Sequence, residues 1–171
     1  MKALLLLFLQ LTAFANPIDK SVRDALVWER KEIAAKVSDY ALGAHILGTL
    51  GYSAREPERR WERVGAVTGA YLSNYAMNYA VKRMAKRERP DGSDRESFYS
   101  GHTSTAFVGA GAICLQSNAR VGIPCYTALV LSAAIGYLRM AAEKHWLSDV
   151  SLGGGVGFAY GRYFPTVIVR F

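Results

Sequence analysis

The chain has 171 residues, of which 51% are hydrophobic, and a formal net charge of +7 at pH 7. This length fits one domain with a sizeable buried core and leaves no room for a second. The positive charge suits nucleic acid, acidic lipid head groups and phosphorylated substrates equally well. Because the sequence contains no nucleic-acid-binding motif, we expect no nucleic-acid partner, and the lipid and phosphate classes are favoured.

The amino terminus has the layout of a secretory signal. A positively charged start is followed by an apolar stretch over Ala3–Leu11, and the small residues Ala13 and Ala15 form a cleavage site. We predict that residues 1–15 are either a cleaved signal peptide or a short first membrane helix. In both cases the chain is exported, and residues 16–171 form a single domain.

The next segment, residues 17–36, is predicted to be an amphipathic helix. Apolar residues recur at near-helical spacing among many charged ones, at Ile18, Val22, Leu26, Ile33 and Val37. Such a helix can lie along a membrane surface or cover a soluble core, and the periodicity fits both positions. We favour the membrane surface.

Longer apolar segments follow and are predicted to be bundle helices: Val37–Tyr52, Val64–Val81, Thr103–Gln116, Gly122–Leu138 and Leu147–Phe164. Residues 64–81 include no charged side chain, and as a helix they would rise roughly 27 Å, just short of a bilayer core. Glycine at four-residue spacing allows close helix approach in membranes. Two such ladders occur, Gly65/Gly69 and Gly153/Gly157/Gly161.

The predicted fold class is therefore all-α, a polytopic transmembrane helical bundle with five or six membrane helices. The mean hydropathy of +0.07 is low for such a chain, so a water-soluble bundle stays open as the alternative. Two charged stretches that we expect outside the bilayer, residues 17–36 and 82–96, account for part of this low mean hydropathy.

Several residues inside the apolar segments are expected to be structural. With only two cysteines, Cys114 and Cys125, both in apolar surroundings, we favour buried free thiols over a disulfide. His45 is predicted to be a hydrogen-bonded histidine within a helix. The tyrosines that repeat every four positions are predicted to serve helix packing: Tyr71, Tyr75 and Tyr79.

Three clusters of charged and titrating residues together supply an oxyanion site. They are K-x6-R-P at Lys82, Arg89 and Pro90, then Ser100-Gly101-His102, then R-x5-H-x3-D at Arg139, His145 and Asp149. The three cations can surround phosphate oxygens, and the two histidines can move protons near neutral pH. The middle cluster precedes an apolar helix, whose free backbone N–H groups bind anions. The pattern indicates phosphoryl transfer.

These clusters resemble the motifs of the type-2 phosphatidic acid phosphatase superfamily, over residues 82–149. That family usually reads Pro-Ser-Gly-His and Ser-Arg, where this chain has Tyr99 and Leu138 in the first position of each motif. The resemblance implies a helical bundle with phosphatase activity. The family includes membrane lipid phosphatases, soluble bacterial acid phosphatases and vanadium haloperoxidases.

The resemblance also implies a role for each residue. His145 is the nucleophile that forms a phosphohistidine, Asp149 holds its other ring nitrogen, and His102 is the general acid. The residues implied to hold phosphate are Lys82, Arg89, Ser100, Gly101 and Arg139. Because three cations can neutralise phosphate in place of magnesium, we expect no metal and no cofactor.

Following the segments in order places the three clusters on one face of the membrane. The loop over residues 53–63 then faces the cytoplasm, and its four arginines agree with the positive-inside tendency. We expect the bacterial inner membrane as the location, with the site facing the periplasm.

The expected function is a membrane lipid phosphatase that hydrolyses a phosphate monoester or pyrophosphate on an outward-facing lipid head group. Lipid A 1-phosphate is the first candidate substrate. Phosphatidylglycerophosphate and undecaprenyl pyrophosphate are alternatives, as is a soluble exported acid phosphatase or vanadate haloperoxidase. A basic membrane protein that only binds anionic head groups is the non-enzymatic alternative.

Overall fold

The structure, a computed structural model, describes residues 15–117 and 122–168. Within these ranges the chain forms α-helices and one short 3₁₀ helix, without strands: α2 (Pro17–Leu26), α3 (Lys31–Ser53), η1 (Pro57–Arg59), α4 (Arg60–Ala85), α5 (Gly101–Gln116), α6 (Ile123–Ala141) and α7 (Leu147–Ile168). The predicted all-α class is confirmed. Apart from Ala15, the expected signal or first helix over residues 1–15 lies outside the described residues.

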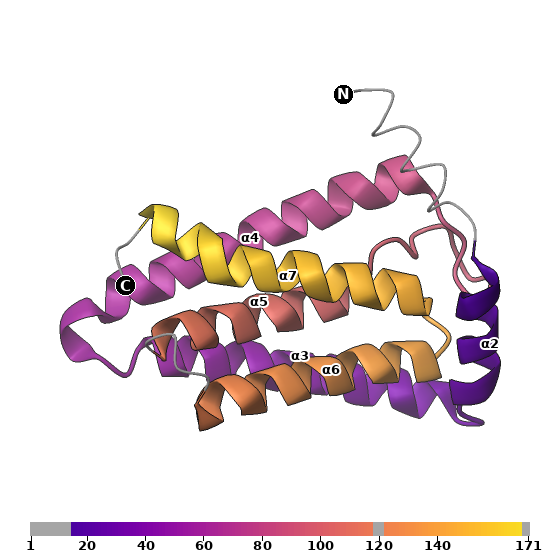
Figure 1. Cartoon of the computed structure of the whole chain (residues 1–171), viewed down its shortest axis with the longest axis horizontal. Helices are drawn as coiled ribbons and strands as arrows, with labels where there is room; N and C mark the ends of the chain where they lie inside the picture. Colours follow the sequence, from indigo (N-terminus) through magenta and orange to yellow (C-terminus); the bar gives the residue numbers. More distant parts are fainter. Residues whose placement is uncertain (1–14, 118–121, 169–171) are drawn as a thin grey trace.

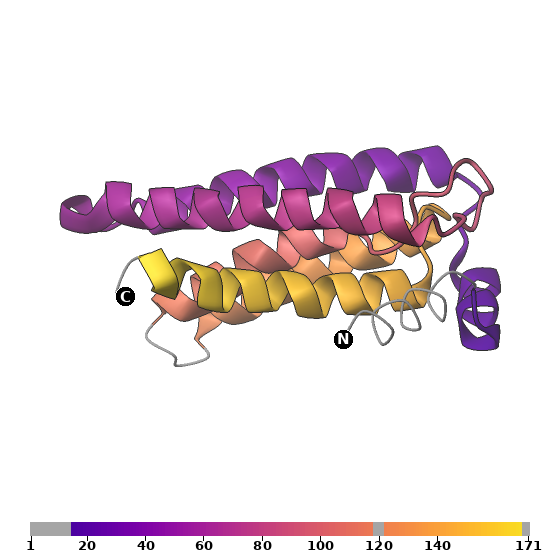
Figure 2. The same cartoon turned by 90° about the horizontal axis from the view of Figure 1, so that it is seen from above.

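The five long helices run side by side along the long axis of the molecule, and α2 stands across one end of the bundle (Figures 1 and 2). Helix α5 lies at the centre, because it packs against α3, α4, α6 and α7. This arrangement brings the end of α4, the start of α5, the end of α6 and the start of α7 to the end of the bundle that α2 covers.

The helix predicted over residues 17–36 is divided in the structure. Helix α2 ends at Leu26, and the chain becomes extended at Val27, whose ψ is 133°. The backbone N–H of Trp28 then donates to the carbonyl of Ala141 at 3.1 Å. The chain therefore leaves its helix to contact the end of α6, and α3 begins in a new direction at Lys31.

Small and polar side chains occupy much of the interior of the bundle, and many large apolar side chains face outward. The interior is filled with small and polar residues, including Ala70, Thr49, Asn74, Ser104 and Ser132, all at most 1% exposed. Large apolar residues face outward in the middle of the helices, at Leu47 (72% exposed), Leu72 (65%) and Val130 (67%). Large apolar side chains exposed in the middle of several neighbouring helices are consistent with a bundle that faces lipid.

Among the described helices, α6 is the one that is both long and apolar enough to cross a bilayer by length and composition. Other long helices carry polar residues on their inward faces, for example Asn74 and Asn78 on α4, and these lower the hydropathy of the whole segment. Of the five or six membrane helices expected from the sequence, hydropathy thus identifies one among the described residues.

Two glycines of α7 allow its close packing against α5. A Cβ atom added to Gly157 would lie 2.0 Å from the carbonyl oxygen of Ser104, and one added to Gly161 would lie 1.9 Å from that of Val108. The prediction that this ladder serves close helix approach is confirmed. In the other ladder, a Cβ placed on Gly69 would lie 3.3 Å from the Phe164 ring of α7, whereas nothing lies within 4 Å of one placed on Gly65.

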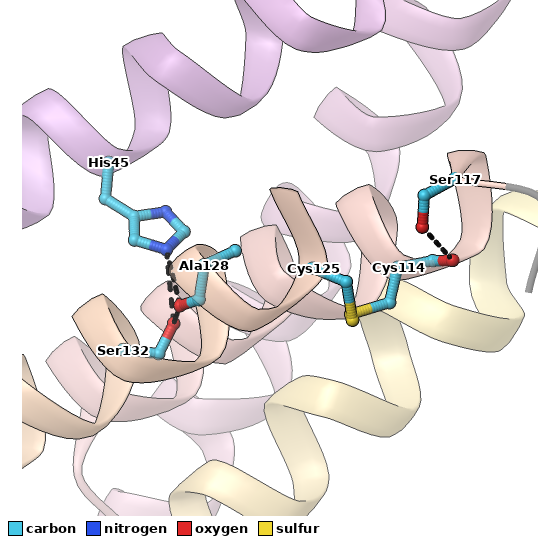
Figure 3. Close-up of a disulfide and its surroundings, with 6 residues drawn as sticks. All are labelled: His45, Cys114, Ser117, Cys125, Ala128 and Ser132. Carbon is cyan, nitrogen blue, oxygen red and sulfur yellow. Dashed lines mark hydrogen bonds between the residues drawn. A yellow bond between two sulfur atoms is a disulfide. The ribbon is translucent and has the colours of Figure 1, made fainter. Parts of the chain in front are cut away.

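At the opposite end of the bundle from α2, Cys114 of α5 and Cys125 of α6 form a disulfide, drawn in Figure 3. The prediction of free thiols is wrong, because the hairpin between these helices brings its two ends together. His45, also drawn there, lies 3.3 Å from the Ala128 carbonyl and 3.2 Å from the Ser132 hydroxyl through Nε2. Its prediction as a hydrogen-bonded structural histidine is confirmed.

Candidate active site

Residues from all three sequence clusters line one cavity of about 300 Å³ near the end of the bundle that α2 covers. The cavity is formed by side chains from α3, α4, α5 and α6 and from the loops that follow α4 and α6. Its lining comprises Leu42, Tyr75, Asn78, Lys82, Arg89, Gly101, His102, Thr105, Arg139 and His145. The three cations expected to bind phosphate and both candidate catalytic histidines are therefore brought together, whereas Ser100 and Asp149 are buried and do not line the cavity.

The loop over residues 86–100 joins α4 to α5 and carries Arg89 back to the cavity. Helix α4 stops at Lys86, which adopts a left-handed conformation with φ of 47°. Helix α5 starts after Ser100, whose buried hydroxyl accepts a hydrogen bond from the Thr103 backbone N–H. The structure thus uses the Ser100 side chain as a helix N-cap. The free N–H groups of the first turn of α5 lie beside the cavity.

Gly101 lies against a side chain that the sequence analysis did not single out. A Cβ atom at Gly101 would lie 3.0 Å from Oδ1 of Asn78, which is a tight contact. The amide nitrogen of Asn78 donates to the Tyr99 carbonyl at 2.9 Å. Asn78 therefore fixes the start of α5 against α4, and no charge or titrating group at this position could have indicated it from sequence.

The ring of His145 is oriented by a backbone carbonyl. Its Nδ1 lies 2.8 Å from the Ser97 carbonyl oxygen, which can only accept, so Nδ1 carries the proton and Nε2 has a free lone pair. Burial, followed by the nearby cations Lys82, Arg139 and Arg89, holds the pKa of His145 well below its usual value. The ring is thus kept neutral, as a nucleophile requires.

The sequence analysis expected Asp149 to hold this ring nitrogen directly, and the geometry is different. Oδ2 of Asp149 is 3.9 Å from Nδ1 of His145, beyond hydrogen-bonding distance. Instead, Asp149 accepts hydrogen bonds from the Ser97 hydroxyl and from the Trp146 backbone N–H, the latter at 2.9 Å. It therefore acts on His145 through Ser97, whose carbonyl holds the ring.

Asp149 also belongs to a buried ion-pair network that reaches α2. Arg87 lies between two carboxylates, with Nη1 2.6 Å from Asp149 Oδ1 and Nη2 2.6 Å from Asp19 Oδ2. Asp19 in turn accepts from the backbone N–H and the hydroxyl of Ser148, at 2.9 and 2.8 Å. Since all three charged groups are at most 2% exposed, this network fixes α2 to the start of α7.

A second carboxylate that the sequence analysis missed is Asp39 of α3. Its Oδ1 lies 2.7 Å from Nε2 of His102 and 3.3 Å from Nη1 of Arg139. Arg139 also donates to the Ser38 hydroxyl at 3.1 Å. Asp39 thus joins the candidate general acid to one of the candidate phosphate-binding cations. Its only sequence signal is a single acidic residue in an otherwise apolar part of α3.

The three cations keep donors available for an oxyanion. Arg89 pairs through Nε with Asp94 at 2.6 Å, which leaves its terminal nitrogens for another acceptor. Nε of Arg139 is buried and has no hydrogen-bond partner among the described residues. Lys82 donates to the Glu96 carbonyl, which holds its ammonium at the cavity. An unpaired buried guanidinium nitrogen is costly, and a bound phosphate oxygen would remove that cost.

The prediction that the α4 tyrosines pack between helices is wrong for two of them, because Tyr75 and Tyr79 are 69% and 52% exposed. Tyr75 is exposed and lines the cavity, so its ring is placed to contact whatever enters. The pattern of one tyrosine every four residues does not distinguish an inward from an outward face of α4.

Known proteins resemble this chain in sequence and in fold. The model of the PAP2 superfamily matches residues 63–171, which include all three clusters. Lipid A 1-phosphatase of Porphyromonas gingivalis is 36% identical over 76 residues, which are 44% of this chain and 17% of that protein. The match thus spans less than a fifth of the length of this relative.

A solved structure has the same fold. It is the crystal structure of a transmembrane PAP2-type phosphatidylglycerolphosphate phosphatase from Bacillus subtilis, with a TM-score of 0.66 and 20% sequence identity. The alignment covers 98% of this chain and 96% of that one, so the similarity extends over the whole bundle.

Proposed function

This chain belongs to the PAP2 superfamily, and from this membership we propose that it is a membrane lipid phosphatase that acts through a phosphohistidine intermediate. The observation that carries the proposal is the cavity itself. A neutral histidine with a free Nε2 and a second histidine paired with a carboxylate face the same small volume, together with three cations.

The first chemical step forms a bond between Nε2 of His145 and phosphorus. The bond from phosphorus to the leaving oxygen breaks, and His102 gives its proton to that oxygen. The cations Lys82, Arg89 and Arg139 stabilise the charge on the non-bridging oxygens, since a loose phosphoryl transition state mainly needs positioning and charge neutralisation. In the second step a water attacks phosphorus, His102 accepts its proton, and phosphate leaves His145.

The lipid character of the substrate is supported by the outer surface and by a second cavity. Large apolar side chains face outward along the bundle, as a bilayer would require. An apolar cavity of about 390 Å³ lies between α3 and α6, and its lining extends to Ala41 and Leu138. These residues precede Leu42 and Arg139 of the catalytic cavity, so an acyl chain in this cavity would leave its head group near the cations.

We place the protein in the bacterial inner membrane, with the catalytic cavity facing the periplasm. Lipid A 1-phosphate is the first candidate substrate because the relative named lipid A 1-phosphatase is 36% identical to this chain over 76 residues. Phosphatidylglycerophosphate, named in the structural neighbour, and undecaprenyl pyrophosphate are alternatives. A soluble exported acid phosphatase would instead leave membranes in alkaline carbonate without detergent.

The decisive experiment measures phosphate release from these three lipids by purified protein in detergent. We expect turnover of at least one lipid, loss of turnover and of trapped phosphoenzyme in His145→Ala, and no effect of EDTA. His102→Ala should retain activity toward nitrophenyl phosphate, whose leaving group needs no proton, while losing most activity toward an alkyl phosphate. A phosphoenzyme that still forms in His145→Ala, or activity abolished by EDTA and restored by magnesium, would contradict the mechanism.

A further inference from the structure

Another cavity, more basic than the catalytic one and distinct from the apolar cavity between α3 and α6, lies beside the catalytic cavity. It has a volume of about 580 Å³ and is bounded by α2, the loop over residues 86–100 and Trp146. Its charged lining consists of five cations and one carboxylate: Lys20, Arg23, Lys86, Arg89, Arg95 and Glu88. This volume falls within the range of small-molecule sites, and the charge selects an anion.

Most of this positive charge is available to a ligand. Lys20, Lys86 and Arg95 form no ion pair with any residue in the described ranges, and all three are exposed. Arg23 differs, because it pairs with Asp24 at 2.6 Å and its guanidinium lies 5.7 Å from the centre of the Trp146 ring. Ordinary surface cations are commonly matched by nearby carboxylates, whereas here like charges from α2 and the loop converge on one cavity.

Arg89 connects this basic cavity to the catalytic one, since it lines both. A molecule whose phosphate contacts Arg89 in the catalytic cavity therefore has the basic cavity directly adjacent. The wall formed by α2 is held in place, because Asp19 is bonded to Arg87 and Ser148 inside the protein. Lys20 and Arg23, on the same helix, are thus presented at a fixed position.

We propose that the basic cavity is a second anion-binding site, which takes a further phosphate or carboxylate group carried by the head group of the same lipid substrate. This inference rests on the proposed function and narrows it. Lipids with a second anionic group beyond the scissile phosphate are preferred over lipids with the scissile phosphate alone. The ammonium and guanidinium groups around the cavity are donors only, which suits phosphate and carboxylate oxygens.

The test uses two matched lipids, lipid A with a phosphate at each end of its disaccharide and the same lipid with only the 1-phosphate. The variant replaces the three unpaired cations: Lys20→Gln, Lys86→Gln and Arg95→Gln. We expect KM for the two-phosphate lipid to rise about tenfold, equivalent to about 1.4 kcal/mol, and KM for the one-phosphate lipid to stay within about twofold. An equal change with both lipids, or no change with the two-phosphate lipid, would overturn the proposal.

A matched control removes the same charge elsewhere. Arg30→Gln, Lys36→Gln and Arg60→Gln replace exposed cations that line neither cavity. If this control raises KM for the two-phosphate lipid by the same factor, the net positive charge of the protein is responsible for the preference, and the second site is rejected. Vesicles containing phosphatidylglycerol test a separate head group as the anion. The assignment of the cavity to a second group of the same lipid would also be overturned if phosphatidylglycerol accelerated hydrolysis of the one-phosphate lipid in vesicles while the two lipids were hydrolysed equally well in detergent.

A binding measurement separates this proposal from the proposed function. If wild-type protein hydrolyses neither lipid, the proposed function fails, and the second site is still decided by calorimetry with the His145→Ala variant in detergent. Tighter binding of the two-phosphate lipid, lost when Lys20, Lys86 and Arg95 are also replaced, supports the site. Equal binding of the two lipids rejects it.

Discussion

The close contact between α5 and α7 makes Gly157→Ala the most informative single substitution outside the cavity. The added Cβ would lie 2.0 Å from the Ser104 carbonyl oxygen, whereas real Cβ contacts essentially never fall below 3.0 Å. The two helices must therefore separate by about 1 Å. Because the obstacle is backbone rather than a flexible side chain, we expect a cost at the upper end of the usual range for overpacking, about 3 kcal/mol.

This cost can be measured as a change in thermal stability. For a chain of this size about 1 kcal/mol shifts Tm by about 2–4 °C, so Gly157→Ala should lower Tm in detergent by about 6–12 °C. The matched control is Gly155→Ala in the same helix, where nothing lies within 4 Å of the new Cβ. That substitution should keep or raise Tm, because alanine has a helix propensity about 1 kcal/mol better than glycine.

The same substitution should affect catalysis. His102 lies in the first turn of α5 and His145 lies just before α7, so separation of these helices changes the distance between the two histidines. A misplacement of about 1 Å can cost about 100-fold in rate. We expect a loss approaching this size in phosphate release, measured well below the Tm of the variant. If Gly157→Ala and Gly155→Ala have the same Tm and the same activity, the reasoning about this helix contact is refuted.

Three further predictions concern the polar network. Asp39→Asn should slow hydrolysis of an alkyl phosphate by about tenfold and that of nitrophenyl phosphate less, because the carboxylate contacts His102, the proposed general acid; equal losses would argue against this role. Arg87→Met should destabilise the protein by about 3–5 kcal/mol, because it leaves two buried carboxylates unpaired, and adding Asp19→Asn should restore part of the Tm. The unfolded chain protonates His145 near pH 6.5, whereas the folded protein does so only well below that value. The free energy of unfolding should therefore fall as the pH drops below about 6.5, by up to about 1.4 kcal/mol per pH unit. The Tm of His145→Gln should fall less than that of the wild-type protein when the pH is lowered below about 6.5.

Sequence patterns predicted the architecture because each long apolar segment had to become a helix, and the three motifs fall at helix ends that the connectivity brings together. They did not reveal the residues that support the motifs. Asp39 contacts His102 across 63 positions and Asp19 contacts Arg87 across 68, and each carboxylate precedes the motif region. In sequence, Asp19 belonged to the polar face of an amphipathic helix, and only packing of α2 across the bundle end buries it.

The break after Leu26 was missed for a related reason. The apolar spacing continues through residues 27–30, but Trp28 gains a backbone hydrogen bond to Ala141 and a ring contact with Tyr137 that a continuous helix could not make. Likewise, two cysteines in apolar segments are compatible with thiols or a disulfide, and only the geometry of the α5–α6 hairpin decides between them.

The position of that disulfide gives the bundle a built-in marker of how it is inserted. The bond joins the last turn of α5 to the first turn of α6, while the catalytic cavity is built from the first turn of α5 and the last turn of α6. In a membrane, the catalytic cavity at one end of this helix pair and the disulfide at the other end would therefore face different compartments. Cysteines are oxidised outside the cytoplasm and kept reduced within it. With the cavity facing outward, as proposed, Cys114 and Cys125 face the reducing side and are expected to be thiols that react with an alkylating agent, whereas the disulfide of the structure would persist with the cavity facing the cytoplasm. Alkylation of the two cysteines in intact cells therefore reports the orientation of the active site without any measurement of activity.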